Sequence, residues 1–122
     1  MDKQYRKEAG DRGEALALRH LEAAGLTLLQ RNYRCKGGEI DLVMRDGPTL
    51  VLVEVRYRRD GRFGGAAASV DTHKQRRLLR AAQHLLQTHP TYRQQRARFD
   101  LVAIEGDGSS AQLNWIKDAF RQ

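Results

Sequence analysis

The sequence lacks several features that would assign it to a special class of protein. Its 122 residues contain a single cysteine, Cys35, which excludes an internal disulfide and a cysteine-based metal cluster. No apolar run approaches the ~20 residues that a membrane-spanning helix needs. We therefore expect a protein of the reducing cytoplasm that does not enter a membrane. The length predicts one domain over residues 1–122.

Acidic residues are missing from a long part of the chain. The net charge is +7, and no Asp or Glu occurs between Thr72 and Phe99. Segregated Arg and Lys residues favour contacts with phosphate groups, because guanidinium groups bind phosphate bidentately. The alternative is a solvated basic surface that serves solubility. We predict a nucleic-acid-binding surface formed by Arg58, Arg59, Arg62, Lys74, Arg76, Arg77 and Arg80.

The apolar pattern predicts an α/β domain. We expect a first helix over residues 11–25, with Asp11 as its N-cap, Glu14 completing a capping box and Gly25 ending it. A second helix begins at Asp71 and is closed by Pro90. Strands are expected at residues 26–34, 38–45, 49–58, 99–105 and 111–117. The order α-β-β-β-α-β-β indicates a mixed central sheet of about five strands flanked by helices.

Carboxylates occur in the middle of two apolar strands that form a predicted hairpin. In the first strand, Ile40, Leu42 and Met44 are expected to share one face. The apolar faces of the two strands match only when each residue of the first strand pairs with a residue of the second whose number, added to its own, gives an odd number. The shortest register of this kind places Asp41 directly opposite Glu54.

Two carboxylates directly opposite each other on neighbouring strands repel each other unless a cation lies between them. A divalent cation such as Mg²⁺ prefers one or two carboxylates, together with water and phosphate oxygens. Arg56 lies on the same face as Glu54, and Glu39 is a third acid nearby. The alternative is an ion network in which arginines neutralise Asp41 and Glu54 without a metal.

Five motifs in this order resemble the YraN family of uncharacterised bacterial proteins. Members of that family are similar to Holliday-junction resolvases and other restriction-endonuclease-like nucleases. The resemblance extends from about Gly10 to Phe120. It is carried by Gly13-Glu14, Gly38-Glu39-Ile40-Asp41-Leu42, Val53-Glu54-Val55-Arg56-Tyr57-Arg58, Phe63-Gly64 and Lys74.

The resemblance implies a restriction-endonuclease-like three-layer fold with a PD-(D/E)xK-type site. Asp41 and Glu54 would then bind Mg²⁺ or Mn²⁺, and Glu14 would match an additional metal-binding glutamate of the resolvase-like branch. The capping box remains the alternative role of Glu14. Arg56 occupies the place of the motif's lysine, and because it keeps its proton it cannot act as a general base. Lys74 is the candidate for a lysine that reaches the site from elsewhere, the alternative being a phosphate-binding or solvated residue.

Three functions follow from these observations. The first is a metal-dependent endodeoxyribonuclease that acts on structured, possibly branched DNA, with Asp41, Glu54, Arg56, Glu14 and Lys74 in the site. The second is a nucleic-acid-binding module that keeps the nuclease fold with weak or no cleavage. The third is an interaction protein with an acidic protein partner. A nuclease that cuts a symmetric junction would also work as a homodimer.

Overall fold

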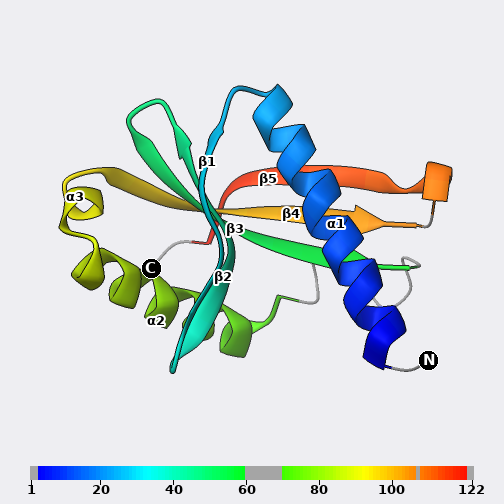
Figure 1. The fold of residues 1–122 in the computed structure, drawn as a ribbon, viewed down its shortest axis with the longest axis horizontal. Helices are drawn as coiled ribbons and strands as arrows, with labels where there is room; N and C mark the ends of the chain where they lie inside the picture. Colours follow the sequence, from blue (N-terminus) through cyan, green and yellow to red (C-terminus); the bar gives the residue numbers. More distant parts are fainter. Residues whose placement is uncertain (1–2, 60–69, 107, 121–122) are drawn as a thin grey trace.

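A five-stranded mixed sheet forms the centre of the protein in the computed structural model (Figure 1). The structure describes residues 3–59, 70–106 and 108–120. Arg62 and the Gly-rich motif that contains Phe63 lie outside these residues. In chain order the elements are α1 (Lys3–Ala23), β1 (Thr27–Cys35), β2 (Gly38–Asp46), β3 (Thr49–Arg58), α2 (Thr72–Thr88), α3 (Pro90–Arg93), β4 (Arg96–Glu105), η3 (Gly108–Ser110) and β5 (Gln112–Phe120).

The predicted α/β class, the element order and the three layers are confirmed, and the arrangement is consistent with a nuclease-like fold. The strands lie side by side in the order β1-β2-β3-β4-β5. Every neighbouring pair is antiparallel except β3 and β4, which are parallel and are joined through α2. The short elements α3 and η3 were not predicted. Among the described residues, no helix combines the length and apolar character needed to cross a bilayer.

The two long helices cover opposite faces of the sheet. Ala17 and Leu21 of α1 pack on one face, where Leu42, Val53 and Val102 are among the buried residues. The other face holds Val43, Leu50 and Leu52, which pack against the buried stripe of α2. That stripe consists of Leu78, Ala81, Ala82 and Leu85. β3 is thus buried on both faces, and its carboxylate is the exception in an apolar strand.

The first helix differs from its prediction at its start. It begins at Lys3, so Asp11 lies inside the helix, and the predicted N-cap and capping box are wrong. The polar start of the chain carries no apolar signal of its own, and packing of the later turns on the sheet supports the helix there. Gly13 lies close to Tyr57, because a Cβ added at Gly13 would stand 3.5 Å from the Tyr57 Cβ. Gly25, at φ 102°, follows the helix end as predicted.

The predicted sharing of one face by three residues of β2 is wrong for Ile40. Leu42 and Met44 pack on the α1 face, whereas Ile40 packs on the α2 face beside its partner Tyr33. Regular pairing with β3 begins at Leu42, so the strand is free to change its alternation before that point. The preceding strand is also irregular there, since Asn32 adopts φ 53°.

A buried carboxylate ties β4 to β5. Asp100 has no exposed surface and accepts hydrogen bonds from both Nε and Nη2 of Arg98, at 3.0 and 3.2 Å. It also accepts from the indole Nε1 of Trp115 at 2.9 Å and from the backbone N–H of Asp118 at 3.0 Å. These donors satisfy a charge that would otherwise be costly to bury.

We expect Asp100→Ala to lower the free energy of unfolding by about 3–5 kcal/mol, because it leaves the partly buried donors of Arg98, Trp115 and Asp118 without their acceptor. Urea denaturation followed by circular dichroism measures this loss. Asp46 accepts one bond from the same Arg98 but is partly exposed, so Asp46→Ala is the control and should cost about 1 kcal/mol or less. Equal losses in the two variants would contradict the assigned role of Asp100.

Candidate functional site

The predicted hairpin register is the one in the structure. Leu42 pairs with Val53 and Val43 pairs with Leu52. Continued by one residue, this register places Asp41 opposite Glu54, as predicted. Asp41 lies directly beyond the last regular pair. There its Oδ2 accepts a hydrogen bond from the backbone N–H of Val55 at 2.8 Å. The backbone of β3 therefore fixes the position of the Asp41 carboxylate.

Asp41 and Glu54 interact directly across β2 and β3. Glu54 is only 9% exposed, and burial followed by the charge of Asp41 raises the pKa of its carboxyl to about 8. Burial also raises the pKa of Asp41, against the opposing effect of the Val55 N–H. A hydrogen bond between the two carboxyl groups raises the pKa of Glu54 and lowers that of Asp41. The pair as a whole therefore holds a proton more readily than two isolated carboxyl groups would.

Glu14 approaches this pair from α1. Burial, and then the negative charge of Asp41, raise the pKa of Glu14 to about 7. Arg31 of β1 opposes this shift, with its Nη2 3.8 Å from Glu14 Oε1. The close contact of Gly13 with Tyr57 brings this turn of α1 against β3. Sequence reasoning did not find Arg31, since nothing in the pattern of β1 indicates which helix residue it meets.

Two cationic side chains complete the cluster. Nη1 of Arg56 lies 3.5 Å from Oε1 of Glu54, and both side chains are mostly buried. Lys74, in the first turn of α2, lowers the pKa of Glu54 electrostatically. Its turn is fixed by Asp71, whose side chain accepts from the Lys74 backbone N–H at 2.9 Å. The structure therefore brings Asp41, Glu54, Glu14, Arg56 and Lys74 to one place.

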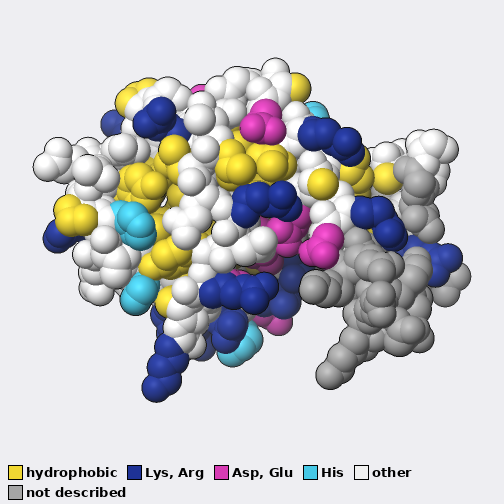
Figure 2. Space-filling view, viewed as in Figure 1, with side chains coloured by type: hydrophobic (Ala, Val, Ile, Leu, Met, Phe, Trp, Pro, Cys, Tyr) yellow, Lys and Arg dark blue, Asp and Glu magenta, His cyan; other side chains and the backbone are white. Residues whose placement is uncertain are grey.

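The described basic residues of the predicted surface lie on α2, which carries Lys74, and at the end of β3, which carries Glu54. Arg76, Arg77 and Arg80 are exposed on α2. Gly38 at the start of β2 allows α2 to approach closely, because a Cβ at this position would lie 2.0 Å from the carbonyl oxygen of Arg77. Arg58 and Arg59 are exposed at the end of β3. Figure 2 shows acidic side chains gathered between the two long helices, with Lys and Arg side chains around them.

The donor chemistry of the cluster fits a hard divalent cation. Asp41 and Glu54 offer carboxylate oxygens, which Mg²⁺ and Mn²⁺ accept together with water. Among the side chains that the structure describes, no set of three His, Cys, Asp or Glu residues is assembled to hold a metal ion. Glu14 is adjacent but is engaged by Arg31. Of the three predicted metal ligands, Asp41 and Glu54 are therefore the two whose arrangement fits a divalent cation.

Comparison with known proteins gives the family. The family model described as uncharacterised protein family UPF0102 matches residues 13–104. The chain belongs to the UPF0102 family. This confirms the YraN resemblance that the motifs indicated. The matched range includes Glu14, Asp41, Glu54, Arg56 and Lys74.

Relatives of similar length carry the same family name. The chain is 53% identical to a UPF0102 protein of Stutzerimonas stutzeri (strain A1501), over 93% of this chain and 95% of the relative. It is 51% identical to one of Pseudomonas syringae pv. syringae (strain B728a), over 98% of both proteins. A UPF0102 protein of Xanthomonas campestris pv. campestris (strain B100) is 55% identical, over 95% of this chain and 93% of the relative.

Replacement of Glu54 by Gln should change the pH dependence of stability. The pKa of Glu54 rises from 4.5 to about 8 on folding, so the folded state binds more protons between these values. The free energy of unfolding of the wild type therefore falls as the pH rises through this window, whereas Gln does not titrate. In EDTA, we expect the Tm of Glu54→Gln to exceed that of the wild type at pH 8, with a smaller difference at pH 5.

Glu39→Gln is the control for this measurement, because Glu39 is a nearby acid with a half-exposed side chain paired to Arg34. Its Tm difference from the wild type should stay nearly constant from pH 5 to pH 8. A Glu54→Gln difference that is equally independent of pH would show that the Glu54 carboxyl does not titrate in this window.

Proposed function

We propose that this protein is a divalent-cation-dependent endonuclease that hydrolyses phosphodiester bonds in structured DNA. The observation that carries the proposal is the direct interaction of two carboxyl groups, those of the buried Glu54 and the partly buried Asp41, inside a protein with a net charge of +7. Such a pair favours a cation between its members. The exposed arginines beside it favour a polyanion as the second ligand.

The ion network without a metal is the competing interpretation, and the electrostatics favour the metal. Arg56 and Lys74 both act on Glu54, and Arg31 acts on Glu14. The pKa values of Glu54 and Glu14 nevertheless stay raised, to about 8 and about 7. The resident cations therefore do not offset the effects of burial, the largest cause of both shifts, and of the negative charge of Asp41. A divalent cation bound to the pair would stabilise the ionised carboxylates and release the proton that the pair holds.

Each residue of the cluster has a role in the proposed reaction. Asp41 and Glu54 would hold the cation, and Glu14 stands beside them as a further acidic group. A cation held by these carboxylates would supply the Lewis acid that polarises the scissile phosphate and lowers the pKa of an attacking water. Arg56 keeps its proton and stabilises the negative charge that builds on the phosphate. Lys74 approaches the same phosphate from the start of α2.

The basic surface supports DNA as the substrate. Arg76, Arg77 and Arg80 on α2 would contact phosphates on one side of the carboxylates, and Arg58 and Arg59 on the other. Backbone contacts of this kind position a duplex or a branch without reading its sequence. Function as a homodimer and a cytoplasmic location are further parts of this proposal.

Metal binding and cleavage test the assigned site. We expect the wild type to bind Mn²⁺ in a calorimetric titration and to cleave branched DNA slowly in Mg²⁺ or Mn²⁺. Asp41→Asn should abolish measurable metal binding and cleavage, because it removes the ligand that Val55 positions. Glu39→Gln is the matched control and should retain both. Full-rate cleavage by a double Asp41→Asn and Glu54→Gln variant would place the chemistry elsewhere.

A second function, a DNA-binding module with little cleavage, is favoured by one observation. Arg56 occupies the position at which the related nucleases carry lysine, and it lies against Glu54. A permanently protonated group at this place cannot accept a proton from water. The cleavage assay separates this function from the first, since a binding module would retain DNA affinity and metal binding without product.

DNA affinity should depend steeply on salt through the arginines of α2. Arg77→Gln with Arg80→Gln should weaken binding and lower the slope of log affinity against log salt by about two, because each phosphate contact contributes about 0.9. Fluorescence anisotropy at several salt concentrations measures this slope. Arg19→Gln with Lys117→Gln removes the same charge from exposed positions outside the predicted surface and should leave the slope unchanged. The same decrease in both double variants would contradict a binding surface on α2.

A further inference from the structure

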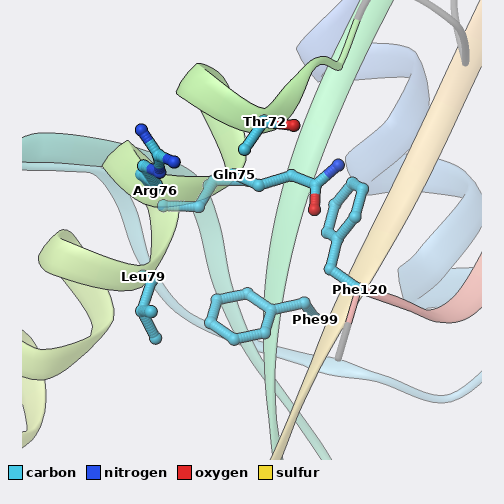
Figure 3. Close-up of a pocket in the computed structure, with 7 residues that line it drawn as sticks. Thr72, Gln75, Arg76, Leu79, Phe99 and Phe120 are labelled. Atoms are coloured by element: carbon cyan, nitrogen blue, oxygen red, sulfur yellow. The ribbon is translucent and has the colours of Figure 1, made fainter. Parts of the chain in front are cut away.

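A cavity of about 170 Å³ lies between the first half of α2 and the ends of β4 and β5 (Figure 3). The activity proposed above does not use it. Figure 3 shows the two phenylalanine rings pointing from the strands toward α2, with the amide of Gln75 beside one ring. The lining includes Thr72, Gln75, Arg76, Leu79, Phe99 and Phe120.

The sheet positions the two aromatic rings. Phe99 and Phe120 are partners across β4 and β5, at the end of the ladder. The strand irregularity that follows Phe99 coincides with the buried Asp100 and its bonds to β5. Both rings are half-buried and pack at the margin of the apolar core under α2. They therefore present aromatic surface to the cavity from a rigid support.

The polar groups stand on the helix side of the cavity. The Gln75 amide donates to the backbone carbonyl of Val70 at 3.3 Å, which fixes its position. A carboxamide carries both donors and an acceptor, so it can bond to the edge of a heterocycle. Arg76 is exposed at the margin, where its guanidinium can reach a phosphate. The cavity therefore offers groups for the base and the phosphate of one nucleotide. The phenylalanine rings can stack on the base, the Gln75 carboxamide can bond to the edge of the base, and the Arg76 guanidinium can bind the phosphate.

The cavity and the carboxylates lie on two sides of the same helix. Lys74 acts on Glu54, whereas Thr72, Gln75 and Arg76 line the cavity. An α-helix with its side chains is ~10 Å wide, so a few nucleotides of a strand laid across α2 could occupy both places. No acidic residue between Thr72 and Phe99 would repel that strand.

We propose that this cavity holds one unpaired base of the DNA, stacked on Phe99 and Phe120, while the adjoining backbone crosses α2 toward the carboxylates. This inference rests on the proposed function and specifies its substrate as DNA with an unpaired or extruded base near the scissile bond. A base that is already unpaired enters without first breaking a pair. Stacking is sequence-tolerant, so bases of every identity are accepted.

The test compares two fluorescein-labelled duplexes of equal length, one fully paired and one with a single-base bulge. Binding is measured by anisotropy with the wild-type protein in EDTA, so that cleavage does not interfere. We expect the bulged duplex to bind about tenfold more tightly, the contribution of one stacked base. Phe120→Leu keeps an apolar side chain and removes the aromatic ring. We expect this variant to bind the bulged and the paired duplex with nearly equal affinity, while its affinity for the paired duplex stays at the wild-type value.

Tyr92→Leu is the matched control, because Tyr92 packs against the same core but does not line the cavity. It should retain the bulge preference. Equal affinity of the wild type for both duplexes, or an unchanged preference in Phe120→Leu, would overturn the base-binding role and leave the nuclease proposal standing. Absence of binding to either duplex at low salt would overturn the nuclease proposal itself. A concentration-dependent dimer that Phe120→Leu disrupts, without any bulge preference, would overturn the inference by making the cavity an interface between two copies.

Discussion

The register between β2 and β3 is the constraint on which the candidate site depends. A shift by one residue would move the apolar residues of β2 to the wrong faces, and Asp41 would no longer stand across from Glu54. The bond from the Val55 N–H to Asp41 adds a second constraint at the point where regular pairing stops. Core packing and the position of the acidic pair therefore depend on the same alignment.

Much of the fold could be predicted because its signals are local. The alternation of β2 and β3, the turn at Gly47 with its φ of 58° and the cap of α2 at Asp71 are all visible in short segments. The start of α1 was missed, because its polar first turns depend on packing by Ala17 and Leu21 further along. Ile40 was placed on the wrong face, because period-two alternation assumes an unbroken strand.

The candidate site was predictable to the extent that it lies within one hairpin. Asp41 and Glu54 follow from the register, whereas the proximity of Glu14 and Lys74 was suggested only by the family resemblance. Arg31 and the Phe99–Phe120 pair left no signal in the sequence, because their neighbours come from distant elements that meet only in the folded sheet. Likewise, nothing near Asp100 in the sequence identifies Trp115 as a donor.

The position of α2 after the β2–β3 hairpin in the chain has a consequence for the order in which the cluster assembles. The hairpin of β2 and β3 is closed by Gly47 and Pro48, so its two acids can meet early and at little entropic cost. Lys74 arrives only when α2 folds back and packs on the face of the sheet that holds Val43, Leu50 and Leu52, which is a slower, non-local step. A nascent chain that ends before α2 would therefore carry the two acids of the hairpin without Lys74, and the cluster would be complete only after α2 has packed on the sheet.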